Sequence, residues 1–401
     1  MRTFTLVSLC LLISLSSMAQ SKNNFWRSVV ESPQLLNEER TVVPDHYQTF
    51  ELQFSAIKAA LNNAPVERST AARNQSFTLT LPLPNGQVEE FAIWEASVMS
   101  PILAAKFPNI KSYKGKGIDD PSKVVRFSIS PTGLHGSFRT KDGQIYIDPY
   151  GPGRTDTYIS YYTRDHHPEH TASECGFDPA SLATSLGENT TPTGDEPVSM
   201  PESGDPVDLY VYRMALSCTG EFAQVHGGTV TGAMNAINTA VNRLNLLFEL
   251  DMAISFQLVD DNDQLIFANP SSDPFLNPSN GGGLMGQNVA LLGTTIGLAN
   301  YDIGHIFTAT CGGGLAGVAG GTVCSLDKGR GVTCHSSSNI TGIVMETMAH
   351  EIGHQFSAGH TWNFCPDLEG QYSSGSAFEP GSGSTILSLS LIHISEPTRP
   401  Y

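Results

Sequence analysis

The stretch AHEIGHQFSAGHTW, residues 349–362, brings three histidines and a glutamate close together in the chain. Residues four apart share one face of an α-helix, so a helix here would direct His350 and His354 toward a common point. A metal ion at that point would be bound through ring nitrogens at about 2.0 Å. Glu351 follows the first histidine but points off its axis, where it can hold a water molecule rather than the metal. The stretch therefore predicts a helix that carries a metal site and a general base.

The apolar residues around this stretch support the helix. Met345, Ala349, Ile352 and Phe356 recur at steps of four and three, and they fall on the face roughly opposite the histidines. We therefore expect one side of the helix to be buried and the other to line a cleft.

Chance is a poor explanation for the motif. A random H-E-x-x-H occurs on the order of once per hundred chains of this length, and a third histidine at a fixed offset, here His360, is rarer still. The full pattern, with His350, Glu351, His354 and His360, resembles the zinc site of the metzincin metalloproteases. The stretch GGGLAGVAGGTVC, residues 312–324, resembles the strand and cysteine that precede this helix in the secreted bacterial members of the adamalysin, or reprolysin, branch.

The resemblance covers residues of about 205 to 386 and implies both a site and a fold. Zinc would be held by His350, His354 and His360, and Glu351 would be the general base of a peptide-bond hydrolase. The implied fold is an α/β catalytic domain with a twisted mixed sheet and an active-site helix, preceded by a β-rich propeptide. The glycine-rich residues 312–318 would form an edge strand that pairs with an extended peptide substrate.

One position departs from the family pattern. Where the chain turns out of the helix, three residues after the second histidine, the family usually has glycine and this sequence has Ser357. A left-handed L-residue there costs roughly 1 to 2 kcal/mol. Gly359 is placed to ease the same turn.

Two other readings of the motif stay open. The third ligand could be a downstream glutamate, Glu369 or Glu379, as in the gluzincins, although both lie in Gly/Ser/Pro-rich sequence. The domain could also be a catalytically inactive binding or adhesion module on a protease fold. The intact Glu351 argues against an inactive module, because a dead site has no need of a base.

The periodicity of the remaining chain predicts two regions. Residues 20–186 alternate like strands in SFTLTLPLP, VVRFSIS and QIYIDPY, and residues 187–206 read as a solvated linker rich in Gly, Pro, Ser and Thr. We therefore assign residues 20–203 to the propeptide and 204–386 to the catalytic domain. Strands and helices alternate after the linker, which is typical of an α/β layer with a partly parallel sheet. The expected elements are strands over 208–214, 252–258 and 301–309 and helices over 230–248, with Thr229 as the cap, and 288–298.

The N-terminal sequence predicts export. Residues 1–19 combine Arg2, an apolar run too short to span a bilayer and a small-x-small site ending at Ala19, as in a secretory signal. Export favours disulfides among the cysteines that remain in the mature chain. Cys175, in ASECGFD, resembles the cysteine switch by which metzincin propeptides block the zinc, although an ordinary disulfide is the alternative. The remaining cysteines are Cys218, Cys311, Cys324, Cys334 and Cys365.

The C-terminal sequence predicts an interruption. EPGSGSTI, residues 379–386, resembles the approach to the family's Met-turn, where a methionine is expected at about position 387 and the chain has Leu387. Residues 389–400 match the translation of a sequencing-library adapter, so we interpret 387–401 as an artefact and expect the natural chain to continue differently.

The net charge of the chain limits the classes of partner that it can bind. The formal net charge of -17 argues against nucleic acid, which needs a basic patch. The sequence as a whole thus predicts a secreted zinc endopeptidase, made as a zymogen, with a protein or peptide substrate and no membrane anchor.

Overall fold

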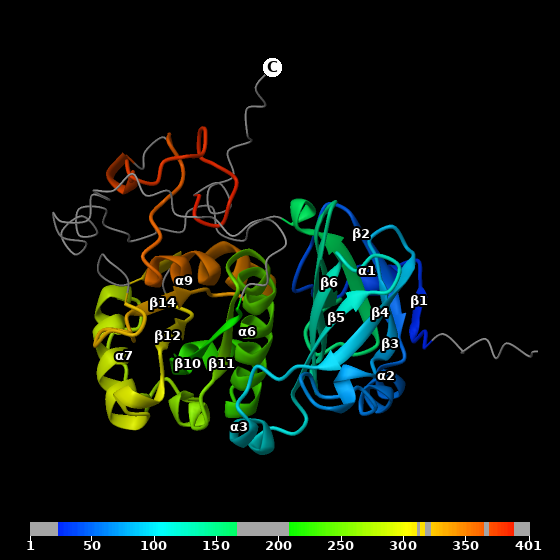
Figure 1. Cartoon of the computed structure of the whole chain (residues 1–401), viewed down its shortest axis with the longest axis horizontal. Coiled ribbons are helices and arrows are strands. Elements are labelled where there is room, and N and C mark those ends of the chain that lie inside the picture. Colours follow the sequence, from blue (N-terminus) through cyan, green and yellow to red (C-terminus); the bar gives the residue numbers. More distant parts are fainter. Residues whose placement is uncertain (1–22, 167–207, 311–312, 317–321, 365–368, 389–401) are drawn as a thin grey trace, which may run out of the picture.

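A computed structural model describes residues 23–166, 208–310, 313–316, 322–364 and 369–388. They form an N-terminal part built on one β-sheet and a C-terminal part built on a second sheet with helices (Figure 1). Among the described residues, no helix is both long and apolar enough to cross a membrane.

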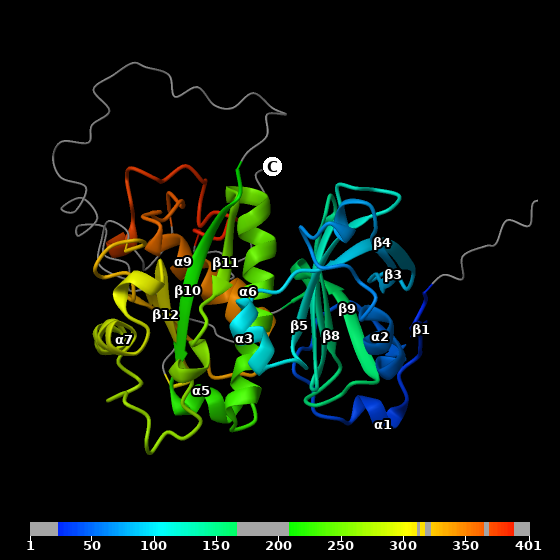
Figure 2. The ribbon, with the colours of Figure 1, turned by 60° about the horizontal axis from the view of Figure 1, so that its bottom comes forward.

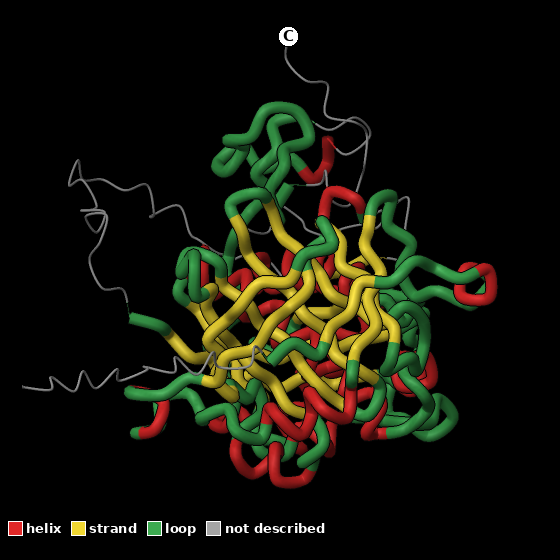
Figure 3. The backbone as a smooth tube through the Cα atoms, turned by 90° about the vertical axis from the view of Figure 1, so that its right-hand side faces the viewer, coloured by secondary structure: helices red, strands yellow, loops and turns green. Residues whose placement is uncertain are grey.

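The N-terminal part is a nine-stranded antiparallel sheet in the order β1-β2-β9-β8-β7-β6-β5-β4-β3, seen face-on in Figure 3. The strands predicted from SFTLTLPLP, VVRFSIS and QIYIDPY are present as β3, β6 and β8. Their alternating apolar residues enclose a core with the helix α2 (Phe54–Leu61). The strands are β1 (Trp26–Ser28), β2 (Tyr47–Leu52), β3 (Phe77–Pro82), β4 (Val88–Glu95), β5 (Lys111–Gly117), β6 (Val124–Ser130), β7 (Gly133–Thr140), β8 (Gly143–Pro149) and β9 (Thr157–Tyr162), and the short helices are α1 (Pro33–Leu36) and α3 (Pro101–Lys106).

The C-terminal part is the predicted α/β layer with a mixed sheet. Its order is β11-β10-β12-β14-β13, with all neighbours parallel except β13 and β14. The glycine-rich segment predicted as an edge strand supplies β13, the last strand in this order. The strands are β10 (Tyr210–Cys218), β11 (Ile254–Leu258), β12 (Ile303–Thr308), β13 (Gly313–Ala316) and β14 (Gly331–Cys334).

Helices cover this sheet on both sides (Figure 2). The long helix α6 (Val230–Met252) begins at the predicted cap, where the Thr229 side chain accepts a hydrogen bond from the amide of Gly232. Helix α7 (Gly281–Thr295) begins seven residues earlier than predicted, because Asn280 caps a first turn made of glycines, which by composition favour a loop. The short helix α5 (Gly220–Val225) precedes α6.

The predicted active-site helix is a continuous helical segment with a wider middle. It consists of α8 (Ile340–Gly342), the π-helical η5 (Ile343–Met348) and α9 (Ala349–Gln355). Single π turns inside α-helices are frequent at functional sites. The expected apolar face is buried: Ala349 and Ile352 are fully enclosed, and Met345 and Phe356 pack on the same core.

Helix α6 lies between the two sheets, and its two faces differ in chemistry (Figures 1 and 2). One face is apolar and joins the core of its own sheet. The other is polar and meets strands β5 and β6 of the N-terminal sheet, where Asn238 bonds Ser112, Thr239 bonds Ser128, and Asn242 and Glu249 bond Arg126. The N-terminal sheet therefore binds α6 mainly through buried hydrogen bonds.

A buried carboxylate connects the two parts at a second point. Asp148 of β8 forms an ion pair with Arg243 of α6 and accepts hydrogen bonds from Tyr161 and from Thr341 in α8. Burial alone would raise the pKa of Asp148, but the charge of Arg243 and the contact with His135 outweigh it and hold that pKa well below its ordinary value. This carboxylate thus links the N-terminal sheet to the start of the active-site helical segment.

A third contact extends the catalytic sheet. The chain between β4 and β5 crosses to the end of β11 and pairs with it through two backbone hydrogen bonds. The amide of Ser100 donates to the carbonyl of Leu258, and the amide of Leu258 donates to the carbonyl of Val98. Lys106 of α3 then pairs with Asp261 and Asp263. The two parts therefore share backbone pairing, and the apolar core is continuous across the boundary expected near residue 203.

We predict that Asp148→Asn lowers the free energy of unfolding of the full chain by about 3 kcal/mol, because Arg243 would stay buried without its counter-charge. Urea denaturation followed by tryptophan fluorescence and far-UV circular dichroism measures the change. The matched control is Arg139→Gln, which breaks the exposed pair with Asp251 across the same interface and should cost less than about 1 kcal/mol. Equal midpoints for Asp148→Asn and wild type would contradict the prediction.

Candidate metal centre

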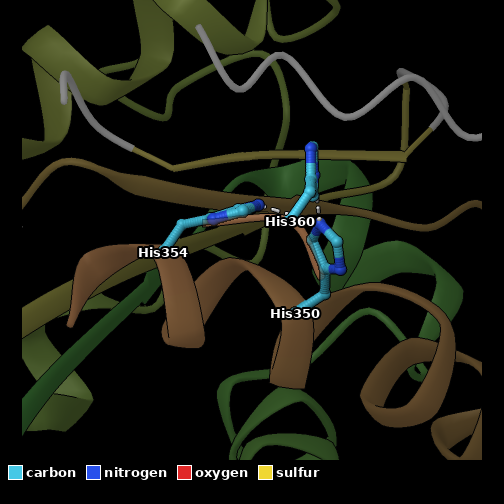
Figure 4. Close-up of side chains that lie close together, drawn as sticks. All are labelled: His350, His354 and His360. Carbon is cyan, nitrogen blue, oxygen red and sulfur yellow. Dashed lines mark hydrogen bonds between the residues drawn. The ribbon is translucent and has the colours of Figure 1, made fainter. Parts of the chain in front are cut away.

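The structure brings the three predicted histidines together. His350 and His354 project from one face of α9, and His360 reaches them from the segment that follows the helix (Figure 4). The Nε2 atom of His350 lies 2.9 Å from Nε2 of His354 and 3.2 Å from Nε2 of His360. Nitrogens bound to one tetrahedral zinc lie about 3.3 Å apart, so the cluster has nearly the required spacing.

Backbone carbonyls set the orientation of all three rings. The Nδ1 atom of His350 lies 2.8 Å from the carbonyl of Ile386, that of His354 lies 2.7 Å from Ala358, and that of His360 lies 2.8 Å from Gln371. In each case the residue type matters little to this contact, because the atom that meets the ring is a backbone carbonyl oxygen.

A carbonyl oxygen can only accept a hydrogen bond, so each Nδ1 must carry the proton. Each neutral ring then presents the unprotonated Nε2 lone pair to the centre of the cluster. Three lone pairs directed at one point repel each other unless a cation lies between them. The ring orientations therefore suit a metal ion.

Burial keeps these rings neutral. Desolvation, helped by the neighbouring His360, lowers the pKa of His350 to about 3, and desolvation lowers the pKa of His360 to about 4. The pKa of His354 is also well below its ordinary value for the same first reason. Neutral imidazole is the form that binds metal.

The expected cleft side of α9 is covered in this structure. The three histidines are 0–5% exposed and Glu351 is 1% exposed. This conformation of the chain encloses these four side chains, and the cleft expected along this face of α9 stays a prediction. Glu351 itself lies in the same turn of α9 as the ligands, between His350 and His354.

The turn after α9 carries the departure noted in the sequence. Ser357 adopts the left-handed conformation, with φ of 70°. Its amide donates to His354, and the amide of Ala358 donates to Gly353, which together make the Schellman ending of a helix. The same turn places the Ala358 carbonyl against His354, so the strained residue supports a metal-binding ring.

Gly359 is required for a different reason. A Cβ atom at this position would lie 2.6 Å from Oγ of Ser376 and 2.9 Å from Oγ of Ser373. Ser376 in turn donates to the carbonyl of His360 at 2.7 Å. The close approach that Gly359 allows thus fixes the backbone of the third histidine.

The end of α9 is anchored to the sheet. Gln355 donates to the carbonyl of Gly304 and contacts Nδ1 of His305 at 2.9 Å, while Nε2 of His305 lies 2.8 Å from Thr333. His305 is fully buried on β12, as its alternation with apolar strand residues suggests. It is a packed strand histidine and does not belong to the group of possible metal ligands found among the described residues.

The segment of residues 379–388 lies beside α9. It supplies the Ile386 carbonyl to His350, and the side chain of Leu387 packs on Gly353, where a Cβ would meet Leu387 at 2.6 Å. Leu387 and Ser388 are buried, although the sequence interpretation placed them in the artefactual tail.

Several sequence-predicted residues lie outside the cluster. Glu379 is engaged by Thr361, Ser384 and Thr385, and it is not part of the group of possible metal ligands among the described residues, which contains the three histidines. Cys175 and the side chain of Glu369 lie outside the described residues.

The described cysteines differ in state. Cys218 and Cys324 are free thiols, and Cys334 is disulfide-bonded.

Sequence reasoning missed the carbonyls that orient the rings. Ile386, Ala358 and Gln371 act through their backbone, which every residue type has, so their side chains leave no signal at these positions. One clue to the Ala358 carbonyl was present in the sequence. The family usually has glycine at the position of Ser357, and such a position indicates the left-handed turn that presents this carbonyl.

The α/β fold and the three-histidine cluster define a zinc metallopeptidase domain. Residues 209–396 match the family model of reprolysin-like metallopeptidases of family M12B. This part of the chain belongs to that reprolysin-like family, whose members use zinc, and the protein is a zinc metalloendopeptidase.

Comparison with solved structures finds metalloproteinase-II from Bacteroides fragilis, with a TM-score of 0.39 and 12% identity, over 80% of this chain and 89% of that one. A superposition this loose supports no argument about fold or mechanism, so the assignment depends on the family match and on the histidine geometry. No curated protein matches the chain significantly.

We predict that Ser357→Gly stabilises the full chain by about 0.5–1 kcal/mol. Glycine removes the roughly 1–2 kcal/mol strain of the left-handed residue but adds about 0.4–1 kcal/mol of unfolded-state entropy. Chemical denaturation of the metal-free protein measures the difference. Ser357→Ala, which keeps the Cβ, is the control and should stay near wild type; the prediction fails if both variants shift stability equally.

Proposed function

We propose that this protein is an exported zinc endopeptidase, made in latent form, in which His350, His354 and His360 hold the metal and Glu351 is the general base. The observation that carries the ligand assignment is the convergence of three Nε2 atoms whose rings are fixed by carbonyls at the opposite nitrogen. Among the described residues, this arrangement favours His360 over Glu379 as the third ligand, because the Glu379 carboxylate is bound elsewhere.

The residues divide the chemistry of hydrolysis. Bound zinc supplies a Lewis acid that polarises the scissile carbonyl and makes a water molecule more acidic. Glu351 takes the proton of the attacking water and later delivers it to the leaving amine. Glu351 directly follows His350 in α9, a position that would place its carboxylate beside the metal rather than on it.

The edge of the catalytic sheet is suited to an extended substrate. Strand β13 pairs with β14 on one side and is the last strand of the described sheet on the other. An edge strand offers backbone groups to which a peptide can add as a further strand, and this mode suits a protease that reads the main chain.

The N-terminal part is proposed to be the propeptide. The signal-like residues 1–19 and the linker at 187–206 give the sequence basis, and the buried metal cluster fits a latent form that a substrate cannot reach. The interface on α6 is mostly polar, and interfaces that separate tend to be more polar than permanent ones.

We predict that Glu351→Gln lowers the rate of cleavage of a denatured protein by at least about 100-fold, because the amide cannot take the proton. The measurement is proteolysis by the full chain after activation, with bound zinc determined by elemental analysis. Zinc should remain at one per chain in Glu351→Gln and be lost in His360→Ala. Wild-type cleavage rates in Glu351→Gln would exclude Glu351 as the base. One zinc per chain together with normal rates in His360→Ala would favour Glu369 or Glu379 as the third ligand.

We predict that Cys175→Ser makes the uncleaved chain active, because a thiolate on the zinc would otherwise exclude the attacking water. Activity before propeptide removal is compared between this variant and wild type. The control is Cys324→Ser, which removes an exposed free thiol and should leave latency unchanged. A disulfide at Cys175 in peptide mass spectrometry, or unchanged latency, would reject the switch.

A further inference from the structure

The carboxylate of Glu379 has an unusually complete set of donors. Its Oε1 accepts hydrogen bonds from the hydroxyls of Thr361 and Thr385. Its Oε2 accepts from the amide of Ser384 at 2.6 Å, from the amide of Thr385 at 3.1 Å and from the hydroxyl of Ser384 at 3.4 Å. These donors come from two segments that are far apart in sequence.

The first segment holds the third histidine. Thr361 directly follows His360, and besides its hydroxyl contact its carbonyl accepts from the Glu379 amide at 2.7 Å. The amide of Thr361 donates to the carbonyl of Leu387 at 3.1 Å. The backbone of Thr361 is therefore hydrogen-bonded to both ends of the loop of residues 379–388, at Glu379 and at Leu387.

The second segment holds the first histidine. Ser384 and Thr385 directly precede Ile386, whose carbonyl accepts the Nδ1 proton of His350. The position of that carbonyl depends on how the turn of residues 380–385 is closed. Glu379 closes it, because its side chain reaches back across the turn to the amides of Ser384 and Thr385.

We infer that Glu379 is a positioning residue of the metal centre, which holds the backbone supports of His350 and His360 in one fixed relation. The inference rests on the proposed role of these histidines as zinc ligands. The residue that sequence reasoning kept as an alternative metal ligand thus acts behind the carbonyl groups that contact the histidine rings. Partners of this kind typically change metal affinity by 10–100-fold when they are removed.

The chemistry of the site selects a carboxylate. Five donors converge on the two oxygens of Glu379, and an amide would replace one acceptor by a donor that faces other donors. Burial alone would raise the pKa of Glu379, but the hydrogen bonds from Thr361, Thr385 and Ser384 outweigh it and keep that pKa below its ordinary value.

The turn also makes room for this carboxylate. Gly383 has φ of 76°, and a Cβ there would lie 3.1 Å from the carboxyl carbon of Glu379 and 2.5 Å from Cβ of Ser388. A side chain at position 383 would push the carboxylate away from the amides that it accepts from.

The experiment compares the isosteric variant Glu379→Gln with wild type in the full chain. Zinc affinity is measured by competition with a chromophoric chelator, and the visible spectrum of the cobalt-substituted protein reports the ligand geometry. We expect a 10–100-fold weaker affinity and a changed cobalt spectrum in Glu379→Gln. Unchanged affinity together with an unchanged spectrum would overturn the inference.

Two controls separate positioning from general loosening. Asn363→Ala removes the hydrogen bond from the Gly381 amide to Asn363 Oδ1, at 2.8 Å in the same loop, without touching the carboxylate. It should change zinc affinity less than threefold. Equal losses in both variants would show that any weakening of the loop has the same effect, and would overturn the specific role of Glu379. Glu51→Gln, on the exposed pair with Arg27, should behave as wild type.

A metal-free measurement keeps this inference distinct from the proposed function. In protein with ¹⁵N-labelled histidine, exchange of the His350 Nδ1 proton should be faster in Glu379→Gln, because the Ile386 carbonyl would no longer be fixed. Faster exchange in Glu379→Gln than in wild type, found together with a wild-type chain that binds no zinc, would support the positioning role of Glu379 and refute the zinc site. Equal exchange rates in Glu379→Gln and wild type would refute the positioning role of Glu379, whatever the metal affinity of the two proteins.

Discussion

The bond from each Nδ1 proton to a backbone carbonyl is the constraint on which the metal centre depends. A helix alone gives His350 and His354 a common side, but it leaves ring rotation free, and the wrong nitrogen or tautomer would not bind a metal. The three carbonyls remove that freedom, and each needs a structural device to hold it. The Schellman turn with left-handed Ser357 presents Ala358, and the loop of residues 379–388 presents Ile386. Much of the irregular chain around α9 can be understood as support for these acceptors.

The elements that follow a regular period could be predicted from the sequence. Helix α6 with its Thr229 cap, strands β10, β11 and β12 and the helix bearing His350 and His354 all repeat apolar residues at the spacing of their secondary structure. The carbonyl acceptors could not be predicted, because a backbone group has no residue type. The π-helical segment η5 was missed as well, since its apolar residues fit an α-helix almost equally. The early start of α7 was missed because capping by Asn280 outweighs the low helix propensity of glycine.

The relation between the two parts of the chain was beyond sequence reasoning for a different reason. The linker composition predicts separate units. Asp148, Arg243 and Thr341 nevertheless meet in one buried cluster, although Asp148 and Thr341 are 193 residues apart in sequence. A single aspartate in a strand and a single arginine in a helix carry no mark of a partner so distant. Asp148 accepts a hydrogen bond from Thr341 in α8, and α8 continues through η5 into the helix that bears His350 and His354. The N-terminal sheet is therefore connected to the metal centre through a continuous helical segment.

The polarity of the α6 interface bears on what the N-terminal sheet is for. A permanent core between α6 and β5 to β7 could have been largely apolar, as most of the opposite face of α6 is. Instead the contact uses asparagine, threonine and serine, which can return to water at little cost because their hydrogen bonds are exchanged for bonds to solvent. The exception is Arg243, which leaves a buried cation behind if Asp148 departs. Removal of the N-terminal sheet would therefore be opposed at this ion pair, at the backbone pairing with Leu258 and where the apolar core continues across the two parts. The start of the active-site helical segment would be affected directly, because Thr341 shares the same carboxylate.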